Sequence, residues 1–283
     1  MTKLSYRLKL WKLRRILALK LRGRIRHHDR FGLSYWLWEN TRALAIPYNH
    51  PATDDAGVFE QITRIYKATS ESANGTVSID VGAYIGIISL AMAKYGPANH
   101  EVHSFEADDV NYAMLNENIS SNQAHSIHPH RTAVGGDNGT FQFTRTSDTG
   151  TNHLGVQDNS TDLGAVVFNV PVTTLDSFAV QQDFDIVRLL KIDAEGADID
   201  VLYGASSLLD EKRIEVIIVE IPLSADARTE MIEFLNSHGM TTAYIQRNSD
   251  QLQPSNEEIY NGSERAPLNI LAVRTDLELQ LLR

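Results

Sequence analysis

A hydrophobic run that ends in an acid and two closely spaced glycines carries the clearest chemical signal of this sequence. Residues 77–86 read Val-Ser-Ile-Asp-Val-Gly-Ala-Tyr-Ile-Gly. Gly82 and Gly86 permit a tight turn in which the backbone approaches a ligand closely, where any side chain would collide. Asp80 supplies a carboxylate that can accept hydrogen bonds or pair with a cation. The pattern predicts a ligand-binding turn between a strand and a helix.

The spacing of the glycines distinguishes this turn from the dinucleotide-binding fingerprint. That fingerprint is G-x-G-x-x-G, with the pyrophosphate at the amino terminus of the following helix. Here three residues separate Gly82 from Gly86, and the middle glycine is missing. Asp80 would also repel a pyrophosphate. A cofactor with a cationic or zwitterionic end therefore fits better than NAD, and an NAD-dependent oxidoreductase is the weaker alternative.

A second acid stands where the next strand is expected to end. Residues 102–106 read Val-His-Ser-Phe-Glu, and Glu106 follows Gly86 by 20 residues. A carboxylate at this place can accept hydrogen bonds from both hydroxyls of a ribose. Together with the glycine turn, Glu106 predicts a cofactor that carries adenosine.

Short apolar strands alternate with helices along most of the chain. Strands are expected at residues 77–81, 101–105, 127–134, 186–192 and 215–220. Helices are expected at residues 58–68, 86–95, 109–121, 198–209 and 226–238. Such alternation indicates a parallel sheet covered by helices on both faces. Residues 241–246 and 268–273 predict two more strands, as an antiparallel pair at one edge.

One segment interrupts the alternation. Asp137-Asn138-Gly139 is a turn signal, and residues 140–145 and 165–172 flank a polar loop. We interpret this segment as a β-hairpin with a long insertion. Long loops at the carboxyl ends of parallel strands often build binding sites, so part of the loop is a candidate substrate contact.

An ordered set of motifs resembles the FkbM family of S-adenosylmethionine-dependent methyltransferases, over residues 77–221 or about half of the chain. Beyond the glycine turn, the set comprises Phe105-Glu106-Ala107-Asp108 with Leu115, Asn118 and Asn122, then Ala133-Val134-Gly135, Thr174-Leu175-Asp176-Ser177-Phe178, Leu190-Lys191-Ile192-Asp193-Ala194-Glu195-Gly196, Val201-Leu202-Tyr203-Gly204-Ala205 and Val219-Glu220-Ile221. The block at residues 191–196 is the most specific to the family. Ala107 and Tyr84 depart from it, since proline is usual at the first position and asparagine or histidine is common at the second.

The resemblance implies an α/β fold of the class I methyltransferase type. This is a Rossmann-like, doubly wound sheet with strand order 3-2-1-4-5-7-6, in which the last strand of the chain is antiparallel. Pro129, between His128 and His130 in the third strand, suits an edge position. His125 joins these two histidines in a trio that is more typical of an exposed edge than of a metal site.

The resemblance also implies how S-adenosylmethionine is held. The glycine turn with Asp80 would hold the methionine end, Glu106 the ribose, and the end of the third strand the adenine. The cofactor-binding residues implied are Asp80, Gly82, Ala83, Tyr84, Gly86, Glu106, Ala107, Ala133, Val134 and Asp193.

Four residues are candidates for catalysis. Methyl transfer from an activated sulfonium needs in-line positioning and removal of a proton from the acceptor hydroxyl. Asp193 and Glu195 follow the fourth strand and are favoured, whereas Glu220 and His153 are further candidates for the base. Glu195 could instead mark a helix start, and Glu220 could be a surface acid. Asp193 and Glu220 could also hold Mg²⁺, although nothing in the sequence requires a metal.

Composition limits the remaining possibilities. The chain of 283 residues has no cysteine, which excludes disulfides, zinc–thiolate sites and a cysteine nucleophile. Its net charge is −10, but residues 1–30 carry +10 and the remainder −20. An acidic body of this size would be repelled by nucleic acid. No membrane span or signal-peptide core is present, so a soluble, cytoplasmic protein is expected.

The basic segment at the amino terminus is expected to contain a helix from about residue 8 to 26. It could contact an anionic membrane surface at the cytoplasmic face, or dock on the acidic body. We predict an extension and connector at residues 1–56 and a methyltransferase domain at residues 57–283.

The sequence and the family resemblance favour an S-adenosylmethionine-dependent O-methyltransferase. The resemblance suggests as acceptor a sugar hydroxyl of a glycan, glycolipid or related metabolite, and the acceptor pocket would come from residues 31–57 and 145–165. A non-catalytic binding module of the same fold is the alternative. The acceptor's identity and the oligomeric state stay open, because a fold alone does not choose a substrate.

Overall fold

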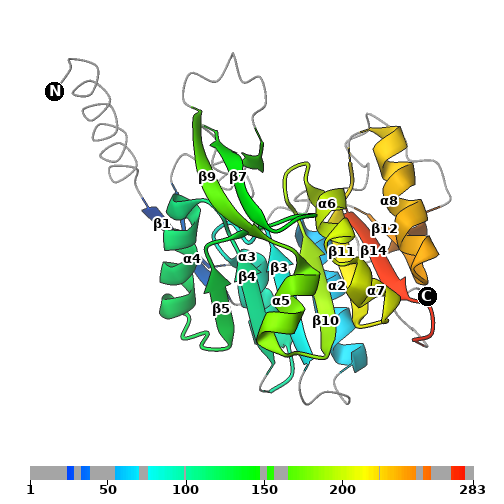
Figure 1. The fold of residues 1–283 in the computed structure, drawn as a ribbon. Coiled ribbons are helices and arrows are strands. Elements are labelled where there is room, and N and C mark those ends of the chain that lie inside the picture. Colours follow the sequence, from blue (N-terminus) through cyan, green and yellow to red (C-terminus); the bar gives the residue numbers. More distant parts are fainter. Residues whose placement is uncertain are drawn as a thin grey trace, which may run out of the picture.

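An eight-stranded sheet with helices on both faces forms the body of the protein (Figure 1). This computed structural model describes residues 24–28, 33–38, 55–69, 76–98, 100–146, 152–155, 165–222, 224–246, 251–255 and 269–277. No helix among these residues is both long and apolar enough to cross a membrane.

The strands of this main sheet are ordered β13-β12-β14-β11-β10-β3-β4-β5. They are β3 (Thr76–Val81), β4 (Glu101–Phe105), β5 (Ile127–His130), β10 (Ile186–Ile192), β11 (Ile214–Glu220), β12 (Met240–Ile245), β13 (Leu252–Pro254) and β14 (Asn269–Arg274). The five strands from β5 to β11 are parallel, and β14 is antiparallel to both of its neighbours. Without β13, which adds an edge strand, this is the order 3-2-1-4-5-7-6 that the resemblance implies.

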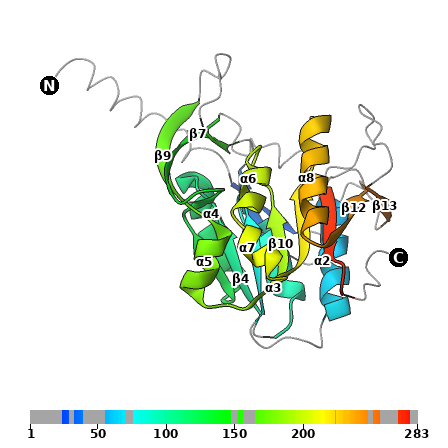
Figure 2. The same cartoon turned by 45° about the vertical axis from the view of Figure 1, so that its right-hand side comes forward.

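Two hydrophobic cores lie on opposite faces of the sheet, because alternate residues of each strand point to opposite sides. In β10, Leu189 packs with the core beneath α2 and α3, whereas Leu190 packs with the core beneath α5, α6, α7 and α8. Figure 2 shows the helices on both sides of the strands. The helices are α2 (Asp55–Thr69), α3 (Ile87–Tyr95), α4 (Asp109–Ser121), α5 (Leu175–Gln182), α6 (Asp198–Tyr203), α7 (Ser206–Asp210) and α8 (Ala225–Ser237).

Two predicted elements are divided in the structure. The strand expected at residues 127–134 ends at His130, and β6 (Ala133–Val134) joins a second sheet. The helix expected at residues 198–209 breaks at Gly204 into α6 and α7. A Cβ on Gly204 would lie 2.2 Å from the carbonyl oxygen of Gly135, so the break allows two backbones to approach closely.

The predicted hairpin forms most of the second sheet, whose order is β6-β9-β7-β8. The strands β7 (Gly139–Arg145) and β9 (Val166–Thr173) are antiparallel, and β8 (His153–Leu154) pairs with β7. Figure 1 shows β7 and β9 rising above the main sheet. A small core that includes Phe143, Val170 and Val172 holds the sheet together.

The amino-terminal region contains a hairpin where a helix was predicted. The strands β1 (Arg24–His28) and β2 (Ser34–Trp38) pair in antiparallel fashion. The expected helix is therefore wrong at Arg24–Arg26, and its remainder lies outside the described residues. Gly23 disfavours continuation of a helix, and residues 24–28 read Arg-Ile-Arg-His-His, with Ile25 as their one apolar residue and therefore no apolar helix face. Leu33 is buried in the core beneath α3.

Candidate active site

The glycine turn after β3 has a backbone that few residues can adopt. Gly82, Tyr84 and Gly86 have φ angles of 74°, 51° and 88°. The N–H groups of Gly82 and Ala83 both donate to the carbonyl of Phe105, at 3.1 and 2.9 Å, which ties the turn to the end of β4. A Cβ on Gly82 would lie 1.8 Å from the backbone oxygen of Asp193. Only glycine fits this position.

Asp80 lies beneath the turn in a row of buried polar groups. Its side chain accepts a hydrogen bond from the Ser89 hydroxyl at 2.5 Å, and Ser104 donates to Ser89 at 2.8 Å. Lys191 lies opposite Asp80 on the neighbouring strand. Burial raises the pKa of Asp80 to about 6, while the hydrogen bond from Ser89 and the charge of Lys191 oppose this.

Glu106 joins the glycine turn to the loop that precedes α4. Its carboxylate accepts the N–H of Tyr84 at 2.9 Å and the N–H of Asp108 at 2.8 Å. Burial raises its pKa to about 8. These bonds stabilise Tyr84, whose left-handed backbone costs about 1 kcal/mol or more in a residue other than glycine.

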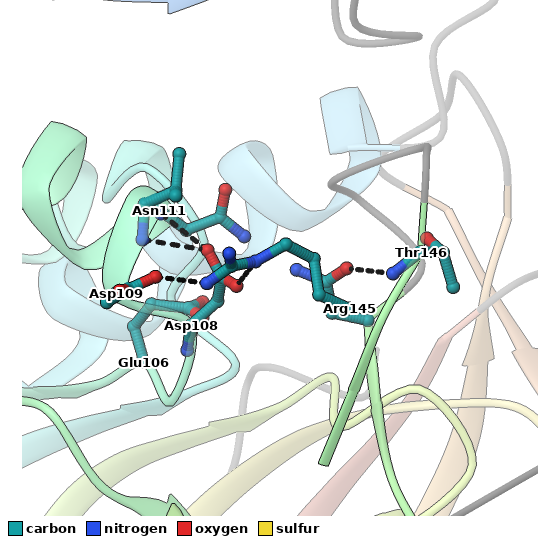
Figure 3. A network of polar contacts seen from close by, with 8 residues as sticks. Glu106, Asp108, Asp109, Asn111, Arg145 and Thr146 are labelled. Atoms are coloured by element: carbon teal, nitrogen blue, oxygen red, sulfur yellow. Dashed lines mark hydrogen bonds and ion pairs between the residues drawn. The ribbon is translucent and has the colours of Figure 1, made fainter. Parts of the chain in front are cut away.

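Arg145 connects the second sheet to the loop that precedes α4, through ion pairs (Figure 3). Asp108 accepts the N–H groups of Val110 and Asn111 at 2.9 Å and so caps α4. The guanidinium of Arg145, at the end of β7, pairs with the carboxylates of both Asp108 and Asp109. It also lies 5.0 Å from the ring centre of Phe168.

A cluster of acids follows β10 and β11. The Asp193 N–H donates to the Val81 carbonyl at 3.1 Å, and its side chain is 44% exposed. Glu195 has a φ of 48° in the sharp turn that leads to α6. Asp198 supports this turn by accepting the N–H groups of Ala194 and Gly196, at 2.8 and 3.2 Å.

Glu220, at the end of β11, completes the cluster. Burial raises its pKa to about 9, and the charges of Asp193, Asp198 and Glu195 add to this effect. The buried Lys191 opposes them, with its Nζ 3.4 Å from an oxygen of Asp193. The charges of three other acids and of one ammonium group thus act on Glu220. Such a site attracts a second cation, and its carboxylates can accept a proton or a hydroxyl hydrogen bond.

The structure brings together most of the residues singled out in the sequence. The turn residues contact Glu106 through Tyr84 and Asp193 through Gly82, and Glu220 is coupled by charge to Asp193 and Glu195. Glu195 lies in the turn that leads into α6, as a residue that marks a helix start would, and Glu220 ends β11, so the catalytic roles of both stay predictions.

Three predicted residues lie in the second sheet. Ala133 and Val134 form β6, and Ala133 packs in the small core that Ala107 adjoins. Their contact with an adenine stays a prediction. His153 is buried in β8, opposite Thr144, and its role as a base also stays a prediction.

Sequence reasoning assigned no role to Lys191, Asp198 or Arg145. Lys191 gave a signal that could have been used, because it is the one charged residue in the apolar run at residues 189–192. Arg145 gave none, because its partner Asp108 is 37 residues away in the chain.

The histidines of β4 and β5 form an aromatic stack. His103 and His130 are joined by a hydrogen bond of 3.1 Å, and burial lowers their pKa values to about 3 and about 4. Over the described part of the chain, no three His, Asp or Glu side chains are arranged to hold a metal ion. Neither the histidine trio nor the Mg²⁺ reading of Asp193 with Glu220 gains support.

The site fits a cofactor with a cationic group. Its acidic groups outnumber the single buried ammonium group, and the glycine turn packs directly against the backbone of Asp193, because a Cβ on Gly82 would collide with it. A pyrophosphate would meet the exposed carboxylate of Asp193 with the wrong sign of charge, and its own negative charge would disfavour ionisation of Asp80 and Glu220 further.

Comparison with known proteins agrees with this chemistry. The sequence model of the methyltransferase FkbM domain matches residues 80–241, more than half of the chain. None of the curated proteins compared with the chain matches it.

Three solved structures show weaker likeness. The FkbM methyltransferase of Methylobacillus flagellatus is 15% identical with a TM-score of 0.42, over 75% of this chain and 47% of that one, so this chain spans about half of its length. A precorrin-6Y C5,15-methyltransferase of Geobacter metallireducens is 14% identical with a TM-score of 0.39, over 75% and 86% of the two chains. An S-adenosylmethionine-dependent methyltransferase of Agrobacterium tumefaciens is 10% identical with a TM-score of 0.46, over 90% and 71%.

Proposed function

We propose, on the premise that this chain belongs to the methyltransferase FkbM domain family, that it methylates a hydroxyl oxygen. The domain is that of an S-adenosylmethionine-dependent methyltransferase. We propose a sugar hydroxyl of a glycan, glycolipid or related metabolite as the acceptor. The observation that carries the proposal is the cluster of Asp193, Glu195 and Glu220 beside the glycine turn.

Three parts of the site would each hold a different part of the cofactor. The turn at Gly82 and Gly86 would receive the methionine end, Glu106 would accept hydrogen bonds from the ribose, and the acidic cluster would favour the positive charge. When bound, S-adenosylmethionine supplies an activated methyl group on a sulfonium.

The acidic cluster supplies what a hydroxyl acceptor requires. A hydroxyl must lose its proton as it is methylated, and a base works best when its pKa lies near the working pH. Burial and neighbouring charge raise the pKa of Glu220 far above that of an ordinary glutamate, and a cation nearby would lower it again. Asp193 is exposed enough to meet an acceptor. We assign proton removal to this cluster, with His153 as a further candidate.

Binding of the cofactor is tested first, by calorimetric titration with S-adenosylhomocysteine. Micromolar binding is expected, weakened about tenfold or more in Asp80→Ala and Glu106→Ala. The absence of binding in the parent protein would leave the non-catalytic module as the better interpretation.

Methyl transfer is then measured with methyl-labelled cofactor and a panel of sugars, amines and carboxylic acids. Incorporation into sugars, as an ether stable to alkali, is expected. Asp193→Asn, Glu195→Gln and Glu220→Gln should lower kcat without abolishing cofactor binding. Incorporation into amines alone would overturn the proposed acceptor class while leaving the methyltransferase activity in place.

A further inference from the structure

Asn118 in α4 and Asn122 directly after its end bind the backbone of β2 as a neighbouring strand would. Asn118 is fully buried, and its Oδ1 accepts the N–H of Trp36 at 2.6 Å while its Nδ2 donates to the Trp36 carbonyl at 3.3 Å. One turn further along the chain, the Nδ2 of Asn122 donates to the carbonyl of Ser34 at 2.6 Å. The β1–β2 hairpin is thereby docked on α4.

Asn118 also contacts the glycine turn. Its Nδ2 donates to the carbonyl of Ile85 at 2.8 Å. Ile85 lies between Tyr84 and Gly86, two of the three residues of the turn with left-handed backbone. One turn before Asn118, Leu115 occupies the space that a Cβ on Gly86 would need. The helix α4 therefore holds the turn on one side and the hairpin on the other.

The amide of Asn118 is held in one orientation by both sets of contacts. A buried amide that loses a partner pays the desolvation penalty of the unpaired group, so the Trp36 N–H and carbonyl select the rotamer that presents Nδ2 to Ile85. A turn with three left-handed residues needs such external contacts, because its backbone is costly to hold. Glu106 supplies one contact at Tyr84, and Asn118 supplies another at Ile85.

We propose that the β1–β2 hairpin is part of the cofactor-binding machinery, and that Asn118 is the positioning residue that links it to the turn at residues 82–86. The amino-terminal region is then more than an appended basic segment, because docking of β2 stabilises the conformation of the turn that receives the cofactor. This inference rests on the proposed cofactor site.

The first test is calorimetric titration of the full chain with S-adenosylhomocysteine. Asn118→Ala removes the bonds to both the hairpin and the turn, and should weaken binding about tenfold. Asn122→Ala is the matched control, because it loses the bond to Ser34 but leaves Ile85 untouched. Its affinity should stay within about twofold of the parent, even where both variants lower Tm by the same amount.

A second pair of variants tests the hairpin itself. The N–H and the carbonyl of Trp36 point to Asn118 rather than to β1, so proline at this position removes the N–H without breaking the β1–β2 ladder. Trp36→Ala loses the same indole but keeps the N–H. We expect Trp36→Pro to bind S-adenosylhomocysteine about fivefold more weakly than Trp36→Ala.

Equal affinity in Asn118→Ala and Asn122→Ala, or in the two Trp36 variants, would overturn the inference while leaving the proposed cofactor site intact. Failure of the parent protein to bind would overturn the proposed function, and this inference with it. If Asn118→Ala and Asn122→Ala lost the same affinity for S-adenosylhomocysteine, in proportion to their loss in Tm, α4 would have a structural role only.

Discussion

At the scale of single residues, Gly82 lies where a neighbouring backbone leaves no room for a side chain. We expect Gly82→Ala to lower the free energy of unfolding by about 3 kcal/mol or more, since a Cβ there would meet the Asp193 oxygen at 1.8 Å. Gly239 provides the control, because its φ is 76° but no atom lies within 4 Å of its Cβ position. Gly239→Ala should cost only the backbone strain, about 1 kcal/mol. Urea denaturation measures both, and equal losses would show that the clash is relieved.

The protonation state of Glu220 should depend on the charge of the bound cofactor. Because burial and the neighbouring acids raise the pKa of Glu220 well above that of an ordinary glutamate, we expect this side chain to be largely protonated at pH 7.5 without a ligand. S-adenosylmethionine brings a sulfonium that favours the carboxylate, whereas S-adenosylhomocysteine does not. Binding of S-adenosylmethionine should therefore release up to about one proton more.

Calorimetry in two buffers of different ionisation enthalpy measures this difference in proton release. Glu220→Gln should abolish most of it, and Glu233→Gln, on the exposed face of α8, should leave it unchanged. The same proton release in Glu220→Gln as in the parent would assign the titration to another group.

At the scale of elements, the ion pairs of Arg145 are one of the contacts that attach the second sheet to the main domain. Arg145→Met keeps a side chain over Phe168 but leaves the buried carboxylate of Asp108 without its cation. We expect a loss of about 2 kcal/mol or more in the free energy of unfolding. Asp109→Asn, at a side chain that is 59% exposed, should cost about 0.5 kcal/mol or less. Similar losses in the two variants would mean that the exposed pair contributes as much as the buried one.

Elements that depend on local pattern could be predicted from the sequence. The glycine turn between β3 and α3 could be predicted because the hydrophobic run, the acid and the glycines are adjacent in the sequence. The hairpin of β7 and β9 could be predicted because Asp-Asn-Gly marks its turn. The division of the predicted third strand between two sheets could not be predicted, since it depends on the pairing of β6 with β9.

The same division applies to the candidate site. Residues within one motif, such as Asp80 and Gly82, were found from spacing. Contacts between distant segments, such as Arg145 with Asp108 or Asn118 with Trp36, follow from packing that no local pattern encodes. Lys191 falls between these cases, because its acidic neighbours Asp193 and Glu195 were singled out in the sequence whereas its own burial beside Asp193 was not.

At the scale of the whole molecule, buried titratable groups act in opposite directions on stability. Burial raises the pKa of Glu106 to about 8 and that of Glu220 to about 9, so the folded protein holds protons that the unfolded chain has lost. Burial lowers the pKa of His103 to about 3 and that of His130 to about 4, so the unfolded chain holds protons that the folded protein lacks. Stability falls with rising pH in the first case and rises with pH in the second.

The two effects occupy different parts of the pH scale. An unfolded glutamate titrates near 4.5 and an unfolded histidine near 6.5. Between these two pH values, the histidines make the folded protein more stable as the pH rises, whereas the carboxyls make it less stable. Well above pH 6.5 the histidines are neutral in both the folded and the unfolded state, and only the carboxyls continue to change stability with pH.

We therefore predict that the ligand-free protein is most stable near pH 6 and loses stability steadily toward pH 9. Glu106→Gln should flatten this decline and also lower stability by a constant amount at every pH, because its amide nitrogen cannot accept the backbone N–H that one oxygen of Glu106 accepts. Urea denaturation at unit steps from pH 6 to pH 9 measures the slope, and Glu220→Gln should remove a further part of it. A decline as steep in the double variant as in the parent would show that neither acid is protonated in the folded protein, and that the acidic cluster is open to water instead of buried.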